Sequence, residues 1–260
     1  HHQPLHGGTD TRHIGHVEMN NLLQKVLHSK RTKKYLWSLT GRPQFAEANG
    51  VKIHLRSPVI SDRVARSIYL GLYERLEARV VIATLQADDR VLELGSGIGY
   101  LSTLCARRIG SDRVTAVEAN PAMETYIRET YRLNEVSPQL NMCVLGNYDG
   151  EVQFNVNDNY SSSSLHDRGG KTIPVPQQSF AGMLAKVQPT YLICDIEGGE
   201  VPLLIDTPLA DVQKICIELH PHIIGNHACS QLVQKLLNEG FDCDWNLSGG
   251  HVFHFSRTLG

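Results

Sequence analysis

Five apolar runs recur along the chain from residue 90 onward, and they constrain its fold more than any other feature of the sequence. They begin at Val91, Val114, Leu140, Tyr191 and Lys214. The segments between most of them, at 98–109, 121–134, 178–187 and 199–206, are long enough for helices that cross back over a sheet. Strands that alternate with such helices pair in parallel, so we predict a doubly wound α/β sheet with helices on both faces.

The chain closes with a different pattern. The extended run "FDCDWNL" is followed by "SGG" and then by "HVFHFSR", which predicts an antiparallel β-hairpin around a tight glycine turn. Five parallel strands followed by a terminal antiparallel hairpin make up the Rossmann-like sheet of the class I methyltransferases. This is the fold class that we predict, with an N-terminal helical extension.

The first third of the chain has a different pattern of apolar residues. Apolar residues recur at helical spacing from Met19 to Thr40, residues 51–57 favour a short strand, and residues 61–86 favour a long helical stretch. The first residues are rich in histidine and glycine and resemble the remnant of a purification tag. We therefore expect a tag or disordered leader at 1–18, a helical cap with a short strand at 19–88, and the main domain at 89–260.

Composition excludes several classes of partner. Charged residues make up 20% of the 260-residue chain and the formal net charge is −2, so no overall field attracts nucleic acid or an anionic membrane. Six cysteines occur without a C-x-x-C pair, and no apolar run approaches the ~20 residues that span a bilayer. These features favour a cytoplasmic protein that does not bind membranes, and they specify no oligomeric state.

A glycine turn follows the first of the five runs. Gly95, Gly97 and Gly99 stand where a doubly wound sheet binds its nucleotide. The dinucleotide fingerprint G-x-G-x-x-G would require glycine at the position of Tyr100, and a P-loop would require Gly-Lys-Ser/Thr, which this turn does not contain. The turn instead suits S-adenosylmethionine, which carries an ammonium and a sulfonium where a dinucleotide carries pyrophosphate.

An acidic residue follows the second strand at the distance that ribose binding requires. Glu118 lies about twenty residues beyond the turn, where a carboxylate can accept hydrogen bonds from both ribose hydroxyls. At the end of the first strand, we expect Glu93 to face the amino group of the same ligand. The predicted cofactor contacts are Glu93, Gly95, Ser96, Gly97, Gly99, Tyr100, Glu118, Ala119, Asn147 and Asp195.

Charged and histidine residues gather after the fourth and fifth strands. "YLICDIEGGE" contains Asp195 and Glu197, and "KICIELHPH" contains Glu218, His220 and His222. Because parallel strands end at one edge of a sheet, we expect these side chains to lie near the glycine turn. Buried charge is costly without a partner, so the cluster is a candidate for chemistry, and ion pairs or helix caps are the alternative.

Five segments in this order resemble the FkbM-type family of S-adenosylmethionine-dependent methyltransferases: "LYE", "VLELGSGIGYLS", "VEANP", "ICDIEGGE" and "IELHP". The resemblance covers roughly residues 68–256, and Asp-x-Glu-Gly-x-Glu followed by Glu-x-His-Pro is its most specific part. It implies a methyltransferase domain at 89–260 that O-methylates hydroxyl groups on natural products or sugars. It further implies cofactor contacts at Glu93, Gly95, Gly97, Gly99 and Glu118, and a substrate side formed by Asp195, Glu218 and His220.

Methyl transfer to a hydroxyl requires in-line alignment and an acceptor for the hydroxyl proton. Within the predicted catalytic group of Asp195, Glu218 and His220, we favour His220 as the base, because an imidazole titrates near neutral pH, and place Asp195 second. A divalent metal held by the same three residues is the alternative, since it could lower the pKa of a bound hydroxyl. A metal-free base and a small hydroxylated substrate are the favoured reading.

Two other functions fit parts of the sequence. The basic run "KRTKK" at 30–34 could contact phosphate in an RNA methyltransferase, although it reads more simply as a solvated helix face. A catalytically inactive protein that binds the cofactor or a partner is the other alternative, and the complete acidic and histidine edge argues against it. The serine-rich segment 159–170 predicts a lid that orders when substrate binds.

Overall fold

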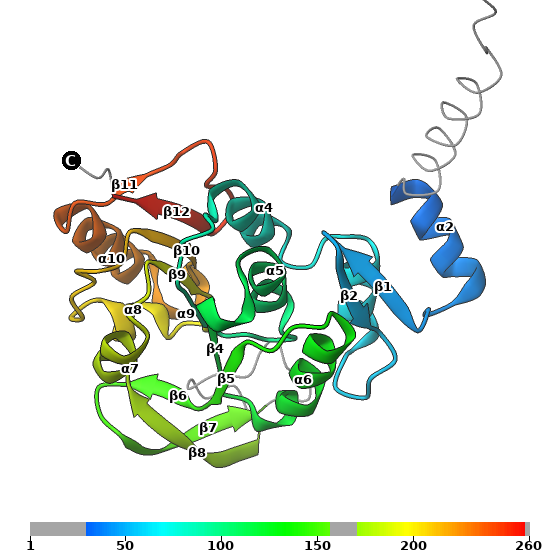
Figure 1. The fold of residues 1–260 in the computed structure, drawn as a ribbon, viewed down its shortest axis with the longest axis horizontal. Helices are drawn as coiled ribbons and strands as arrows, with labels where there is room; N and C mark the ends of the chain where they lie inside the picture. Colours follow the sequence, from blue (N-terminus) through cyan, green and yellow to red (C-terminus); the bar gives the residue numbers. More distant parts are fainter. Residues whose placement is uncertain (1–29, 157–170, 258–260) are drawn as a thin grey trace, which may run out of the picture. The chain divides into compact units, whose positions relative to one another are not determined.

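The computed structural model describes residues 30–156 and 171–257 (Figure 1). It divides into two compact units, at residues 1–43 and 44–260. In the first unit, α2 (Lys30–Thr40) forms the later part of the helix predicted from Met19. The predicted leader at 1–18 and the predicted lid at 159–170 lie outside the described residues.

The second unit is built around a seven-stranded sheet with the strand order β11-β12-β10-β9-β3-β4-β5. Five of its strands are parallel, as predicted, and each begins at or beside the expected residue. They are β3 (Val91–Leu94), β4 (Val114–Glu118), β5 (Gln139–Met142), β9 (Tyr191–Cys194) and β10 (Lys214–Glu218). The carboxyl ends of these strands therefore form one edge, where polar side chains from distant parts of the sequence meet.

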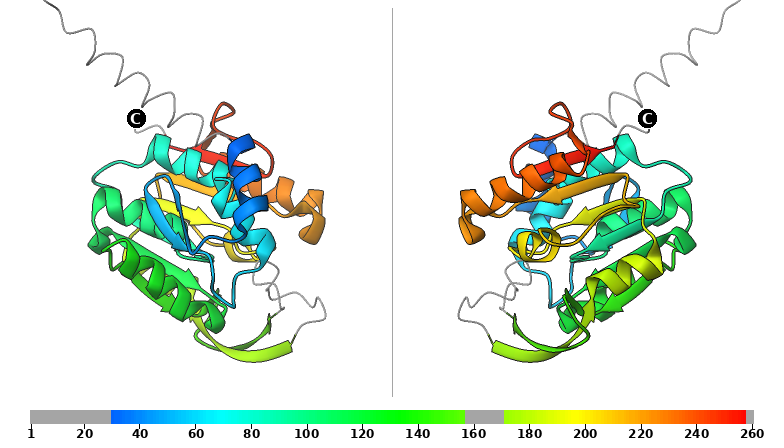
Figure 2. Two further views of the ribbon diagram at one scale, coloured as in Figure 1. Left: turned by 90° about the vertical axis from the view of Figure 1, so that its right-hand side faces the viewer. Right: turned by 90° about the vertical axis from the view of Figure 1, so that its left-hand side faces the viewer.

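Helices cover both faces of the sheet, because its strands are apolar on both sides (Figures 1 and 2). One face packs α7 (Phe180–Val187), α8 (Glu200–Leu204) and α10 (Asn226–Asn238) against a cluster that includes Leu92, Leu94 and Ile215. The other face is covered by α4 (Arg75–Thr84), α5 (Tyr100–Ile109) and α6 (Glu124–Leu133). Two short 3₁₀ turns precede β4 and α6, at Ser111–Arg113 and Pro121–Met123.

The terminal hairpin differs in detail from the prediction. β12 (Val252–Ser256) pairs antiparallel with β10 and with β11 (Asp242–Cys243), so the antiparallel pairing is confirmed. The connection is longer than the predicted glycine turn and occupies residues 244–251. Asp244 accounts for this, because its carboxylate accepts hydrogen bonds from the backbone of Asn246 and Leu247 and so folds the chain before the glycines are reached.

Residues 61–86 form two helices where the sequence predicted one long helical stretch. α3 (Asp62–Tyr69) ends before Gly71, whose φ is +65°, and α4 begins after Glu74, whose φ is +42°. Two residues with left-handed backbone break the helical path between them. The break also turns the first residues of α4 toward the carboxyl edge of the sheet.

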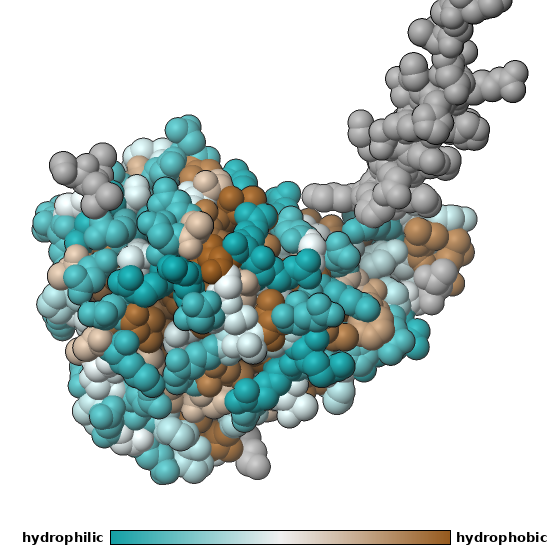
Figure 3. Space-filling model, viewed as in Figure 1, coloured by the Kyte–Doolittle hydropathy of each residue, from teal (hydrophilic) through white to brown (hydrophobic). Residues whose placement is uncertain are grey.

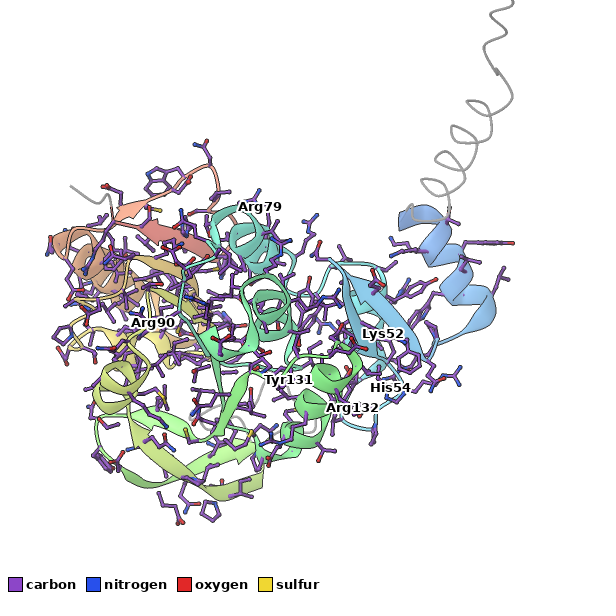
Figure 4. The ribbon with its side chains drawn as sticks, in the orientation of Figure 1. Lys52, His54, Arg79, Arg90, Tyr131 and Arg132 are labelled. Atoms are coloured by element: carbon purple, nitrogen blue, oxygen red, sulfur yellow. The ribbon has the colours of Figure 1, made fainter. Side chains whose placement is uncertain are left out.

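A hairpin at 45–54 precedes these helices. β1 (Phe45–Ala48) and β2 (Val51–His54) join through Asn49-Gly50, both with positive φ, which is the preferred chemistry of a two-residue hairpin turn. The sequence predicted only its second strand. The hairpin packs on α6, where Figure 4 shows Lys52 and His54 beside the helix, and the Tyr126 hydroxyl donates to the His54 carbonyl.

The sequence did not predict the three-stranded sheet of this unit. β6 (Val144–Gly146) pairs in parallel with β8 (Lys171–Ser179), and β8 pairs antiparallel with β7 (Gly150–Val156). Val144, Phe154 and Val175 give this sheet a small hydrophobic cluster of its own. It follows β5 directly and reaches the same edge of the main sheet.

The surface in Figure 3 is mostly hydrophilic, with apolar residues in small scattered patches. Scattered apolar side chains are normal on the surface of a globular protein. Among the described residues, no helix is both long enough and apolar enough to cross a membrane.

Candidate active site

A cavity of about 850 Å³ opens at the carboxyl edge of the parallel strands. Its walls come from the glycine turn, the ends of β4, β9 and β10, the start of α4, and the β6-β8-β7 sheet. The predicted site residues that line it are Gly95, Gly97, Glu118, Ala119, Asn147, Asp195 and Glu218. Small-molecule sites typically enclose ~300–1,000 Å³, so this cavity has the size of a ligand site.

The glycine turn is fixed by backbone geometry that residues other than glycine rarely adopt. The N–H groups of Gly95 and Ser96 donate to the Val117 carbonyl at 3.0 and 3.1 Å, which ties the turn to β4. Gly95, Gly97 and Gly99 all have positive φ. A Cβ on Gly95 would lie 1.8 Å from the Asp195 carbonyl oxygen, so the turn and the end of β9 touch through bare backbone.

Glu118 is the acidic residue of the cofactor end. Its carboxylate accepts hydrogen bonds from the N–H groups of Gly97 and Asn120, both at 2.8 Å. Burial raises the pKa of this carboxyl, and the backbone hydrogen bonds oppose that rise. A carboxylate has about four acceptor positions, so two remain for a ligand in the cavity that Glu118 lines.

Glu93 lies below the turn and not on the cavity wall. Its side chain points to the α5 face of β3, where the Ser102 N–H donates to one carboxylate oxygen at 3.1 Å. The other oxygen has no hydrogen-bond partner among the described residues. Burial raises the pKa of Glu93 to about 7. Ser96 is buried beside it, with its hydroxyl 3.2 Å from that of Ser102.

Tyr100 and Gly99 also lie away from the cavity. The Tyr100 hydroxyl accepts a hydrogen bond of 2.7 Å from the Asn49 side chain and so holds the β1-β2 turn. Gly99 precedes the first residue of α5, and a Cβ there would lie 2.9 Å from a methyl carbon of Ile127. These two residues pack the turn against its neighbours, whereas their predicted place was beside the ligand.

Acidic side chains form the opposite wall of the cavity. Asp195 and Glu197 follow β9, Glu218 ends β10, and Glu74 and Glu77 come from the start of α4. Among the described residues that line the cavity, Arg75 is the one with a positively charged side chain. Glu74 and Glu77 were not among the site residues predicted from sequence, and both reach the cavity because the chain turns at the left-handed Glu74.

Burial and mutual repulsion change the protonation of this wall. The pKa of Asp195 lies well above its ordinary value because the carboxyl is buried and because Glu218 and Glu197 are close. Burial, together with a hydrogen bond and charge repulsion from Glu218, raises the pKa of Glu77 to about 7. A positively charged group bound here would relieve the repulsion.

His220 stands behind the acidic wall. Its Nδ1 lies 2.8 Å from Glu200, and its Nε2 lies 3.6 Å from Asp195 Oδ1 and 4.0 Å from Glu197 Oε2. Burial lowers the pKa of His220. The hydrogen bond to Glu200 and the negative charges of Glu200 and the nearby carboxylates raise this pKa by more, so the net shift is upward. The imidazole is not among the residues that line the cavity.

Glu200 and His222 complete the surroundings of this imidazole. The fully buried Glu200 carboxylate also accepts from the backbone N–H groups of Ile196 and Gly198, at 3.2 and 3.1 Å. His222 is exposed, with its ring centroid 5.7 Å from that of His220. Of the cluster predicted at the strand ends, Asp195, Glu218 and His220 offer ligand atoms that all lie within 4.8 Å of one another.

The model of the methyltransferase FkbM domain matches residues 93–243 of this chain. The chain belongs to the FkbM methyltransferase family. The matched residues run from the end of β3 to β11 and include the glycine turn, Glu118 and the whole acidic wall except Glu74 and Glu77. No curated protein matches the chain in sequence.

Solved structures with a similar fold include three methyltransferases. The precorrin-6y C5,15-methyltransferase of Geobacter metallireducens GS-15 is 13% identical, with a TM-score of 0.45 and coverage of 71% of this chain and 87% of that one. A putative O-methyltransferase from Klebsiella pneumoniae is 11% identical (TM-score 0.44; coverage 70% and 80%). The methyltransferase FkbM of Methylobacillus flagellatus KT is 11% identical (TM-score 0.42; coverage 78% and 56%).

Proposed function

We propose that this FkbM family member transfers the methyl group of S-adenosylmethionine to a hydroxyl of a small molecule. The observation that carries the proposal is the Glu118 carboxylate, held by Gly97 and Asn120 at the wall of a ligand-sized cavity with two acceptor positions to spare. The acidic wall faces this end of the cavity from β9, β10 and the start of α4.

The residues present fit the cofactor. Glu118 offers acceptors for two ribose hydroxyls, and Gly95 and Gly97 expose backbone on which the ligand can lie. The acidic wall complements a ligand with ammonium and sulfonium charges. Ala119 and Asn147, which line the cavity between β4 and β6, would border the adenosine. When bound, S-adenosylmethionine supplies the methyl group and leaves as S-adenosylhomocysteine.

The chain's own part in the reaction is to align the hydroxyl and to receive its proton. Asp195 and Glu218 line the cavity, so these carboxylates would meet the hydroxyl first. His220 acts behind them and positions Asp195, because its imidazole is buried and is itself held by Glu200. This differs from the direct-base role favoured from sequence, because the imidazole does not line the cavity.

The charge of the cavity favours a small molecule over RNA. An RNA backbone would bring its phosphates close to a wall of carboxylates. Among the described residues that line the cavity, Arg75 is the one basic residue that could offset this repulsion. A neutral polyol, or a hydroxyl on a larger molecule without phosphate, meets no such repulsion. Cys143, which lines the cavity, and Cys194, which precedes Asp195, are buried, and burial raises the pKa of both thiols.

Calorimetry with S-adenosylhomocysteine tests the cofactor end. Glu118→Ala removes the acceptors for the ribose, so we expect the dissociation constant to rise about 10- to 100-fold, the cost of two charge-assisted hydrogen bonds that are partly replaced by water. Glu151→Gln, at an exposed position on β7, is the matched control and should bind like the wild type. Thermal melts of both variants show that each is folded.

Transfer of an isotopically labelled methyl group to a panel of hydroxylated small molecules tests the acceptor. We expect mass spectrometry to locate the label on oxygen. Binding of NAD in place of S-adenosylhomocysteine would overturn the cofactor proposal. A label found on nitrogen, on carbon or on RNA would overturn the hydroxyl acceptor while leaving the cofactor in place.

A further inference from the structure

Three potential ligands for one ion meet at the ends of β9 and β10. These strands are parallel neighbours with Ile217 opposite Cys194, so Asp195 and Glu218, one residue further along, come together. His220 follows two residues later, and one ligand atom from each of the three lies within 4.8 Å of the others. A cation bound at about 2.1 Å needs ligand atoms roughly 3–4 Å apart, and the 3.6 Å between His220 Nε2 and Asp195 Oδ1 lies in that range.

The imidazole of His220 is oriented for this role. Its side chain is 6% exposed, and its Nδ1 faces the Glu200 carboxylate at 2.8 Å. If Nδ1–H donates to Glu200, the lone pair of Nε2 points toward Asp195. Metal-binding histidines are held in this way by a carboxylate on the second ring nitrogen. Within the described residues, Nε2 makes no hydrogen bond, and its neighbours are the two carboxylate oxygens at 3.6 and 4.0 Å.

Asp195 supplies a second, independent observation. Its Oδ1 atom is buried and has no hydrogen-bond partner among the described residues. This oxygen lies 3.6 Å from His220 Nε2, too far for a hydrogen bond, so a buried polar atom is left unsatisfied beside a possible nitrogen ligand. An ion between the two atoms would satisfy both.

We propose that Asp195, Glu218 and His220 bind one divalent cation, of the Mg²⁺ or Mn²⁺ class. Two carboxylates and one imidazole match the oxygen and nitrogen preference of these ions. The cation would also offset the negative charge of the wall formed with Glu74, Glu77 and Glu197. Its place in methyl transfer, next to the hydroxyl that must lose a proton, rests on the proposed function, whereas the binding site itself does not.

Manganese binding to the full chain tests the site without any catalytic turnover. Electron paramagnetic resonance of a Mn²⁺ titration counts bound ions, and the electron spin-echo spectrum reports nitrogen coupled to the ion. We expect one Mn²⁺ per chain that Mg²⁺ displaces, with a nitrogen signal from an imidazole. Asp195→Asn, Glu218→Gln and His220→Gln should each weaken binding at least about tenfold, and His220→Gln should remove the nitrogen signal.

Glu197→Gln is the matched control, because this carboxylate belongs to the same wall and lies 4.0 Å from the same imidazole, but is not one of the three ligands. We expect it to weaken Mn²⁺ binding less than each ligand variant does, because it removes a nearby charge and no coordination bond, and to leave the nitrogen signal in place. The histidine-rich leader is present in every variant, so any ion that it binds cancels in the comparison. Thermal melts with and without Mn²⁺ provide a second readout, since an ion that binds the folded state raises the melting temperature.

The outcomes separate this inference from the proposed function. Equal Mn²⁺ binding by the wild type and the three ligand variants, or a nitrogen signal that persists in His220→Gln, would overturn the metal site. Normal S-adenosylhomocysteine binding in that case would leave the proposed function standing, with protonated His220 as the counter-charge of the wall. Specific Mn²⁺ binding without S-adenosylhomocysteine binding would keep the site and overturn the proposed function. If one ligand variant fails to fold, the other two decide.

Discussion

Gly95→Ala should be among the most damaging single changes in the chain, because the glycine is required twice over. Its φ is +83°, a region that costs a residue with a Cβ about 1–2 kcal/mol. The new Cβ would also lie 1.8 Å from the carbonyl oxygen of Asp195, a contact that must open to at least 3.0 Å. Gly71→Ala isolates the first cost, since Gly71 has a φ of +65° and nothing within 4 Å of its Cβ position.

The second cost follows from how the two strands are tied. The Asp195 N–H donates to the Leu94 carbonyl at 2.9 Å, directly before Gly95, so the clash cannot be relieved without stretching this hydrogen bond. A lost buried hydrogen bond costs about 1–3 kcal/mol, which brings the total for Gly95→Ala to about 3 kcal/mol or more. The control should lose about 1 kcal/mol.

Thermal unfolding of the two variants beside the wild type checks this reasoning. At about 2–4 °C per kcal/mol for a chain of this size, Gly95→Ala should melt ~6–12 °C lower and Gly71→Ala ~2–4 °C lower. The clash also displaces Asp195 from the cavity wall, so Gly95→Ala should weaken S-adenosylhomocysteine binding while Gly71→Ala does not. Similar melting temperatures and similar affinities for the two variants would refute the steric argument.

Two further predictions concern buried charge. Glu93 has a folded pKa of about 7 against an ordinary 4.5, so the native state binds the extra proton and its stability falls as pH rises between these values, by at most about 1.4 kcal/mol per pH unit. Glu93→Gln should lose less stability than the wild type when urea unfolding at pH 8 is compared with urea unfolding at pH 5. The same loss of unfolding free energy in the wild type and the variant would contradict this prediction. Lys214→Met should cost about 3 kcal/mol, because the buried Asp89 carboxylate 2.5 Å away loses its cation. Arg128→Ala is the control, because the Arg128 side chain is 57% exposed in its ion pair with Glu124; it should change the free energy of unfolding by under about 0.5 kcal/mol. If chemical denaturation shows the same loss of stability for Lys214→Met and Arg128→Ala, burial does not determine the strength of these ion pairs.

The parallel strands could be predicted from sequence because both faces of the main sheet are covered, which leaves uninterrupted apolar runs such as Val91–Leu94. The β6-β8-β7 sheet carried no such signal. Pro174 and Pro176 argue against a strand, since proline cannot donate to a ladder. In the described part of the chain, β6 pairs with residues 177–179 of β8, and no strand pairs with that side of β8 at Pro174 and Pro176, so a missing N–H costs little there.

The candidate site was predictable to the extent that it comes from strand ends. Asp195 and Glu218 follow apolar runs, and the parallel topology brings them together whatever the intervening loops do. Glu93 lies inside such a run, one residue before the end of β3. The alternation of side chains along the strand turns it to the α5 face. Glu77 was out of reach, because it enters the cavity from a helix whose start depends on the left-handed Glu74.

Among the described residues, two different hydrophobic clusters support the walls of the cavity. The glycine turn and the strand ends rest on the large cluster of the main sheet, whereas Phe154 and Gln177 reach the cavity from the β6-β8-β7 sheet, which has its own cluster around Val144 and Val175. Leu145 of β6 packs on the large cluster, so mutations that change the small sheet without touching this contact need least compensation in the large one. Natural divergence or laboratory evolution can therefore reshape this wall of the cavity while the glycine turn and the strand ends of the main sheet are retained.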